Sequence, residues 1–332
     1  YSFVKDIGER WDSLEVDFSN ALKLGIDIDH LKWNTELIKK LNLPFEIFPN
    51  LVKSGVLIGE SKGFFAKKLN LKNASVMQGT TDGNAQALSA GAIEEHDIAI
   101  NTGSTTSIKF VTQKKKKIKG MYYHIHPLSN YYLLSAATDS GIYYDLFLKM
   151  FNYDYEKAEQ EANRVKIDDT FIFLPPGQRN PFQIPNMGSS ILYLWYKNYE
   201  IEYMKGVMLR SILQSIAFLE YYYVEIILKY FDYINDIHIS GGFTNNNLLN
   251  QIRANVYGRQ IKIVEENIPL GALIPALINS NKLTVSEIKQ KIKIKQTLLP
   301  DANQKNYEKK YIEFKYAWNN ISKLYKKLYE IS

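Results

Sequence analysis

The chain has 332 residues, of which 45% are hydrophobic and 23% are charged, with a formal net charge of +6 and no cysteine. This composition fits a globular chain of about two domains and excludes disulfides, thiol catalysis and thiolate metal sites. The basic residues are spread along the chain, so we expect no nucleic-acid partner. No apolar run reaches the length of a membrane span, about 18 to 20 residues, and no signal-peptide pattern is seen, so we expect a cytoplasmic protein without membrane association.

The first seventy residues lack a strand–helix repeat of their own, and the first residue is Tyr rather than Met. We therefore expect the chain to begin partway through a larger protein. Asp17, Asn20 and Trp33 are candidates for lining a ligand cleft. A role in supporting the fold is favoured for all three, because buried Trp and turn Asp are common in any domain.

Residues 75–92 join a short apolar run to a helix of small side chains through a turn that carries one carboxylate, Asp82. The pattern predicts that residues 76–77 end a buried strand, that residues 79–83 form a tight turn and that residues 85–92 are helical. An acid at such a junction points into a cleft. Alternatively, Asp82 only caps the helix, since Asp is among the preferred capping residues.

Residues 98–111 contain two β-rich runs around Gly103, Ser104 and Thr105, which predicts a hairpin. Its turn offers backbone N–H groups and hydroxyls, and such a turn can hold phosphate. The basic run at residues 114–117 follows between probable strands, and we interpret it as a solvated hairpin tip.

His124 and His126 alternate on a predicted strand, so both lie on one face. A metal site is not favoured there, because no carboxylate lies nearby at ligand spacing. Residues 131–141 predict a strand followed by small residues and a helix start. Residues 171–181 predict a buried strand that runs into a proline-constrained loop, in which Arg179 either positions a phosphate or, as we favour, ties the loop to the core.

Apolar residues recur at helical spacing through residues 200–231, which predicts a long helix. Residues 237–249 then predict a strand, a double glycine at Gly241 and Gly242, and a helix that starts near Asn246. Bare glycine backbone lets a ligand approach closely. The β–α alternation continues to about residue 282, and a final helix is expected near the end of the chain.

In this order and at these separations, the Asp82 turn, the Gly103 hairpin and the glycine pair resemble the FGGY family of carbohydrate kinases. The resemblance implies that Asp82 is the catalytic base and that Asp82 and Gly83 contact the sugar. It also implies ATP and Mg²⁺ as cofactors, although the family's metal-linked acid belongs to its amino-terminal lobe, so no metal ligand is assigned in this chain. The nucleotide contacts implied by the resemblance are Gly103, Ser104, Thr105, Ala136, Ser140, Gly241, Gly242 and Asn246.

This chain departs from the family pattern at two places. The family carries glycines where Ala136 and Ala137 stand, and it usually carries an acid where Gln178 stands. Both departures lie in segments that the resemblance places near the nucleotide or in the loop beside it.

The resemblance covers nearly the whole chain and implies an α/β fold of the actin-like ATPase, ribonuclease-H-like type. The second lobe is expected to be nearly complete and the first lobe truncated. Residues 1–73 are expected to be a remnant of the sugar-binding lobe, residues 74–298 the nucleotide-binding lobe, and residues 299–332 a terminal helix packing back toward the first lobe. Such a chain is expected to be inactive as a kinase by itself.

Residues 79–83 and 20–25 look most similar to pentulokinases that act on ribulose or xylulose, while gluconate and hexulose kinases stay open. The expected partners are therefore a small-molecule sugar and ATP, and a homodimer is left open. Two further classes remain as alternatives. One is a noncatalytic nucleotide-binding module, and the other is an actin-like or chaperone-type ATPase.

Overall fold

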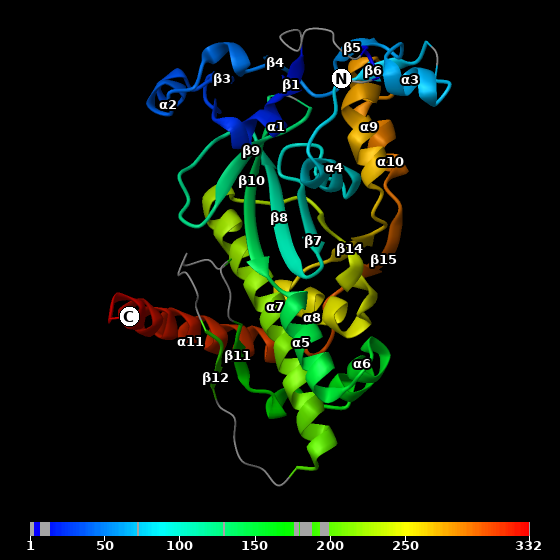
Figure 1. The fold of residues 1–332 in the computed structure, drawn as a ribbon. Coiled ribbons are helices and arrows are strands. Elements are labelled where there is room, and N and C mark those ends of the chain that lie inside the picture. Colours follow the sequence, from blue (N-terminus) through cyan, green and yellow to red (C-terminus); the bar gives the residue numbers. More distant parts are fainter. Residues whose placement is uncertain are drawn as a thin grey trace.

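The computed structural model describes residues 3–6, 14–71, 73–128, 130–175, 179, 188–192 and 199–331. At its centre is a seven-stranded sheet in the order β15–β14–β13–β7–β8–β10–β9 (Figure 1). In chain order its strands are β7 (Ile98–Thr102), β8 (Thr105–Thr112), β9 (Tyr122–Ile125), β10 (Tyr132–Asp139), β13 (Ile237–Ser240), β14 (Ile261–Val264) and β15 (Ile294–Leu298).

The sheet is mixed. Strands β7, β8, β10 and β9 pair antiparallel, β13 and β14 run parallel to β7, and β15 returns antiparallel at the edge. Parallel neighbours need long crossovers, and here helices supply them. The predicted α/β class is therefore confirmed, with the strand–helix alternation confined to the second half of the sheet.

Rows of isoleucine align the central strands. Ile98 of β7 pairs with Ile237 of β13, which pairs with Ile261 of β14, and a second row follows two residues later. These side chains are buried. A slip by one residue would turn every one of them to the opposite face, so the sequence pattern fixes the register.

Helices cover both faces of the sheet. α4 (Asp82–Ser89) and α9 (Ile268–Asn279) pack on each other over one face, next to α10 (Val285–Lys291). α7 (Ile201–Phe231) and α8 (Asn247–Tyr257) form the main core with the other face. The remaining elements of this part are α5 (Gly141–Phe151), α6 (Tyr155–Asn163), η4 (Ile167–Asp169), β11 (Ile172–Leu174), β12 (Ser190–Leu192), η5 (Gly242–Asn245) and α11 (Gln304–Ile331).

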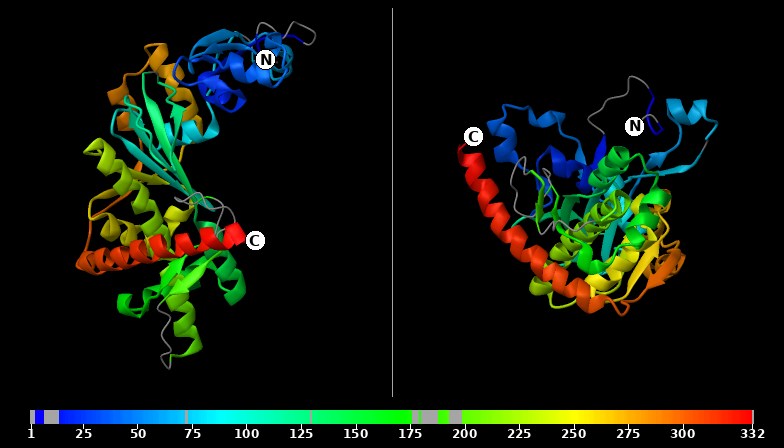
Figure 2. Two further views of the ribbon diagram at one scale, coloured as in Figure 1. Left: turned by 90° about the vertical axis from the view of Figure 1, so that its left-hand side faces the viewer. Right: turned by 90° about the horizontal axis from the view of Figure 1, so that it is seen from below.

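Among the described residues, one helix, α7, is long and apolar enough to cross a membrane, judged by length and composition alone. In this fold 72% of its most apolar stretch is buried against other elements, so its apolar character is explained by its place in the core. α11 packs on α8, α7 and β11, near the end of the large sheet away from the N-terminal segment (Figures 1 and 2). Its packing toward the first lobe stays a prediction.

The N-terminal segment, residues 14–77, lies beyond one end of the large sheet (Figure 1). Its strands form only two-stranded pairs, β1 with β4, β2 with β3 and β5 with β6. Its elements are β1 (Glu15–Asp17), α1 (Phe18–Ala21), η2 (Leu22–Leu24), β2 (Ile26–Asp27), β3 (Lys32–Trp33), α2 (Thr35–Lys40), η3 (Phe45–Ile47), β4 (Asn50–Val52), β5 (Leu57–Glu60), α3 (Phe64–Lys68) and β6 (Ser75–Met77).

Two residues of this segment support the fold, as favoured from the sequence. Asp17 is fully buried and its carboxylate accepts hydrogen bonds from the N–H groups of Ser19 and Asn20 at the start of α1. Trp33 is also buried, and its indole N–H donates to the carbonyl of Pro49 at 2.9 Å. A buried carboxylate and indole satisfied in this way contribute to a small core rather than to a cleft.

The predicted burial of two segments, residues 75–77 and the basic run at residues 114–117, is wrong. Residues 75–77 do form a strand, but β6 pairs only with β5 and stays partly exposed, so it belongs to the N-terminal segment and not to the buried sheet. The basic run is not wholly solvated either. Lys115 pairs with Asp29, and the Nζ of Lys116 lies 5.1 Å from the ring centroid of Phe231, because long lysine stems can pack on apolar surface.

A fully buried ion pair joins α7 to α8. The Nε and Nη2 of Arg253 lie 2.8 Å from the two carboxylate oxygens of Glu220, and neither side chain is exposed. Tyr257 donates its hydroxyl to the same carboxylate at 2.9 Å. Burial alone would lower the pKa of Arg253, but the charge of Glu220 raises it, so the guanidinium stays charged.

The same pair reaches the turn between β7 and β8. Arg253 donates to the hydroxyl of Thr102 at 2.9 Å, and the Thr106 hydroxyl lies within hydrogen-bond distance of Glu220, Thr102 and Ser140. Ser140 in turn donates to the carbonyl of Gly103 at 3.0 Å. One buried network therefore links two core helices to the hairpin turn.

We expect Glu220→Gln to lower the free energy of unfolding by about 3 to 5 kcal/mol, because it leaves the Arg253 guanidinium buried without a counter-charge. Glu225→Gln on the same helix is the control. Its carboxylate contacts Lys315 and Tyr311 but is 42% exposed, so its loss should cost about 1 kcal/mol or less. Urea unfolding measures both, and equal losses would contradict the account.

Candidate active site

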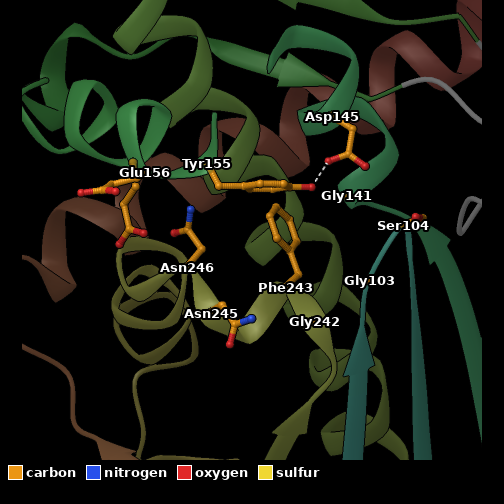
Figure 3. Close-up of a pocket in the computed structure, with 11 residues that line it drawn as sticks. Gly103, Ser104, Gly141, Asp145, Tyr155, Glu156, Gly242, Phe243, Asn245 and Asn246 are labelled. Atoms are coloured by element: carbon orange, nitrogen blue, oxygen red, sulfur yellow. Dashed lines mark hydrogen bonds between the residues drawn. The ribbon is translucent and has the colours of Figure 1, made fainter. Parts of the chain in front are cut away.

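A cavity of about 540 Å³ lies at the carboxyl ends of β7 and β13 (Figure 3). Four segments form its wall: the β7–β8 turn, the start of α5, the first turns of α6, and the stretch from η5 into α8. The lining residues are Gly103, Ser104, Gly141, Asp145, Tyr155, Glu156, Glu159, Gly242, Phe243, Asn245 and Asn246. The edge of a sheet outside the carboxyl ends of parallel strands is a common place for ligand sites in α/β folds.

The β7–β8 turn is held against the start of α5 by backbone contacts. The N–H of Gly141 donates to the carbonyl of Gly103 at 3.0 Å, and the N–H of Ser140 donates to the carbonyl of Ser104 at 3.1 Å. A Cβ on Gly141 would lie 2.4 Å from the Gly103 oxygen, so only glycine permits this approach. Sequence reasoning did not assign Gly141 to the site, although a glycine between a strand and a helix start was visible.

The two glycines after β13 have different roles. Gly241 has φ of +100°, and a Cβ there would lie 2.3 Å from the Thr102 carbonyl, so this glycine allows β13 to approach β7 closely. Gly242 has nothing within 4 Å of its Cβ position and lines the cavity. Asn246 also lines the cavity, and its side chain caps α8 by accepting from the N–H of Leu249 at 2.7 Å.

The wall of the cavity that α5 and α6 form carries negative charge. Asp145, Glu156 and Glu159 line it, and the described lining residues include no lysine or arginine. Tyr155 donates its hydroxyl to Asp145 (Figure 3), and this hydrogen bond, together with partial burial, raises the pKa of Tyr155 to about 12. The ring of Phe243 stands beside that of Tyr155 (Figure 3). Such a wall suits a flat apolar group that carries amino donors better than it suits a phosphate.

The cavity unites four of the residues singled out from the sequence, Gly103, Ser104, Gly242 and Asn246. Ser140 is buried behind the turn that it holds, and Thr105 begins β8 opposite Asp139. The assignment of Ala136 to the nucleotide site is corrected, because Ala136 lies in the middle of β10 opposite Ile108 with no exposed surface, inside the main core. Gln178 lies outside the described residues.

Asp82 is the first residue of α4, and Thr81 occupies the N-cap position before it. The Asp82 carboxylate is exposed and accepts a hydrogen bond from the N–H of Gly83 at 2.7 Å. A negative charge in the first turn is favourable because it meets the positive end of the helix dipole. Asp82 therefore lies within the helix start, not at the capping position, and it is separate from the residues that line the cavity.

The two histidines are structural. His126 is buried and bonds through Nε2 to the carbonyl of Ala92 at 2.9 Å, while its Nδ1 accepts from the N–H of Leu128. Burial, together with the charges of Lys109 and Lys23, lowers the pKa of His124 to about 4. Within the part of the chain that the structure describes, no group of three or more His, Asp or Glu side chains could hold a metal ion.

Comparison with known proteins gives one family. The model of the FGGY family of carbohydrate kinases, C-terminal domain, matches residues 105–280. A xylulose kinase from Staphylococcus epidermidis is 22% identical over 327 residues, which cover 94% of this chain and 65% of the relative. Glycerol kinase 1 from Thermotoga maritima is 24% identical over 301 residues, which cover 86% and 59%. The chain thus spans about 65% of the length of the xylulose kinase and 59% of the length of the glycerol kinase.

Solved structures of similar proteins share the fold. Ligand-bound xylulose kinase from Lactobacillus acidophilus superposes with a TM-score of 0.83 at 20% identity, covering 95% of this chain and 66% of that one. Plasmodium falciparum glycerol kinase with ADP superposes with a TM-score of 0.81 at 18% identity, covering 93% and 63%. The predicted actin-like fold is therefore confirmed.

Gly141→Ala should lower the free energy of unfolding by about 1 to 3 kcal/mol, since the added methyl group forces the turn away from α5. Gly242→Ala is the matched control, because its Cβ would meet no atom within 4 Å. We expect it to change stability by about 0.5 kcal/mol or less. Thermal and urea unfolding compare the two, and a Gly141→Ala protein as stable as the control would show that the turn is not packed as described.

Proposed function

The chain belongs to the FGGY family of carbohydrate kinases, and from this membership we propose that the natural protein that carries this sequence transfers the γ-phosphoryl group of ATP to a hydroxyl group of a sugar. The observation that carries the proposal is the cavity at the ends of β7 and β13, which places a glycine turn, a bare glycine and a capped helix start around one space. Its volume is within the range of small-molecule sites, about 300 to 1,000 Å³.

In this proposal the nucleoside lies in the cavity and the phosphates lie toward Gly103 and Ser104. Two features support this orientation. The carboxylates of Asp145, Glu156 and Glu159 repel phosphate but accept hydrogen bonds from an exocyclic amino group. Backbone N–H groups of a hairpin turn suit anionic oxygens instead. The glycerol kinase of similar fold was solved with ADP, which fits a nucleotide in this fold.

Mg²⁺ is proposed to arrive bound to the ATP phosphates, whose charge it partly neutralises. The described residues offer no cluster of three ligands for it, so none of them is assigned to the metal.

Asp82 is proposed as the general base. Phosphoryl transfer passes through a loose transition state, so the protein mainly aligns the two reacting oxygens and balances charge. An exposed carboxylate fixed at a helix start can accept the proton of a sugar hydroxyl that comes within about 3 Å. Gly83, the next residue, is also proposed to contact the sugar.

The substrate is proposed to be a ketopentose such as ribulose or xylulose. This preference is supported by relatives that are named xylulose kinase and that match 94% of the chain, together with the sequence of residues 79–83. Relatives named glycerol kinase and gluconokinase match nearly as well, so a panel of ribulose, xylulose, gluconate and glycerol decides the substrate. We further propose a cytoplasmic protein without a nucleic-acid or membrane partner, as expected for an enzyme of soluble sugars.

The position of Ala136 bears on whether the site is degenerate. Because Ala136 is in the core, the missing family glycine there does not alter the cavity wall. A noncatalytic module therefore gains no support from this residue. An ATPase that needs no sugar is the remaining alternative, and hydrolysis of ATP at the same rate with and without sugar would favour it.

Gly242→Val should weaken ATP binding at least about tenfold while sugar affinity stays within about twofold. The branched side chain enters the cavity, and a tenfold loss corresponds to about 1.4 kcal/mol. Isothermal titration of both ligands measures this. Gly188→Val is the control, since Gly188 does not line the cavity. Unchanged ATP affinity in a folded Gly242→Val protein would move the nucleotide to another site.

Asp82→Asn should lower turnover about 10²- to 10⁴-fold, the usual contribution of a general base, because Asn has nearly the same shape but cannot take the proton. ATP affinity should be unchanged, as Asp82 does not line the cavity. The assay follows sugar-dependent ADP release by the natural protein that carries this sequence. Turnover within about threefold of wild type would rule out Asp82 as the base.

A further inference from the structure

Lys109 is the lysine that the fold buries, as every other lysine with a described burial is at least partly exposed. It lies in β8, between Ala99 of β7 and Ser135 of β10. These small neighbours leave room for the long stem, and only 7% of the residue is exposed. A buried ammonium group is costly unless it is hydrogen-bonded and charge-balanced, so its surroundings need an explanation.

The head of Lys109 lies under the first turn of α4. Its Nζ is 2.7 Å from the Oδ1 of Asn84, and a Cβ placed on Gly83 would be 3.3 Å from the same Nζ. Asn84 is itself fully buried and donates to the carbonyl of Ile125 at 3.3 Å. Lys109 therefore ties the turn that carries Asp82 to the underlying sheet.

The charges around Lys109 come from three elements. α4 contributes the carboxylate of Asp82, η2 contributes Lys23, and the end of β9 contributes His124 with His126 just beyond it. The pKa of Lys109 is lowered to about 8, because burial lowers it, the charge of Asp82 partly offsets this, and the charge of Lys23 adds to the lowering. The pKa of both histidines falls to about 4, so they are neutral near pH 7.

Among these groups Asp82 is the one negative charge. Asn84 provides a hydrogen bond but no charge, so Asp82 is the group that balances the buried ammonium. The two groups attract each other because their charges are opposite. Lys109 thus holds the turn that carries Asp82 through Asn84 and supplies a positive charge beneath that turn.

We propose that Lys109 is a positioning residue for Asp82. Lys109 anchors the first turn of α4 through Asn84, and its charge balances that of the Asp82 carboxylate. This inference rests on the proposed function, in which Asp82 is the base. It adds that the base works beside a buried cation supplied by β8, and that the rate depends on the ionisation of this pair.

The first test needs no turnover. Lysine is labelled with ¹³C at Cε, and the Lys109 resonance is followed against pH in the wild-type and Asp82→Asn proteins. Asp82 is exposed, so this change should not disturb the fold. We expect the apparent pKa of Lys109 to fall by about half a pH unit or more when the nearby opposite charge is removed. Glu313→Gln on α11 is the control and should leave the resonance unchanged. An identical Lys109 titration in wild type and Asp82→Asn would overturn the proposal.

The second test uses the pH dependence of kcat/KM for the sugar. Lys109→Gln keeps a hydrogen-bond donor near Asn84 but removes the charge, so the acid limb should move up by about half a pH unit or more. Lys262→Gln, on strand β14 of the same sheet and paired with Asp236, is the matched control. A uniform loss of rate with an unmoved acid limb would show a merely structural role and would overturn the proposal. Absence of any sugar-dependent turnover in the natural protein that carries this sequence would instead refute the proposed function, while the resonance test still decides the Lys109–Asp82 interaction.

Discussion

The fully buried pair of Glu220 and Arg253 is the interaction on which the geometry of the candidate site depends. Two charges leave water at high cost, and the fold compensates by satisfying both with short hydrogen bonds from α7, α8 and β7. Because each partner needs the others in place, the two core helices and the strand cannot shift independently. The pair is therefore better understood as fixing one arrangement than as adding stability.

Hydrogen bonds through hydroxyl groups and backbone connect this pair to the turn that lines the cavity. Thr106 and Ser140 connect Glu220 to the carbonyl of Gly103, and Gly141 closes against the same carbonyl. On the other side of the cavity, Gly241 allows the end of β13 to lie close to β7. Two glycines and a buried polar network thus hold the β7–β8 turn and η5 at the same edge of the sheet. A turn fixed in this way needs no further ordering at the moment of binding.

The sequence predicted the parts of this site that depend on local pattern. The Asp82 segment and the glycine pair were predicted as strand, turn and helix start, and the Gly103 segment as a hairpin. All three are found, although α4 already begins at Asp82, inside the predicted turn. Ala136 was misassigned because β10 continues to Asp139, which places residue 136 in mid-strand and turns its side chain into the core. The burial of β6 was overestimated for a related reason, since an apolar run does not reveal how many strands will pair with it.

The remainder depends on tertiary packing. Asp145, Tyr155 and Glu156 stand on ordinary helices whose sequence gives no sign of a ligand, and only the docking of α5 and α6 beside η5 brings them to one cavity. Lys109 is a comparable case, because a single lysine in an apolar strand carries no local signal and its meaning comes from the turn of α4 above it. Local chemistry can thus be read along the chain, whereas the walls of a cavity and the field around a charged group require the fold.

A crystal structure of the protein with a non-hydrolysable ATP analogue tests the central claim most directly. The account predicts the base in the cavity beside Tyr155 and Phe243, the ribose near Gly242 and Asn246, and the phosphates directed toward Gly103 and Ser104. Electron density for the analogue at another place, with this cavity empty, would contradict the account.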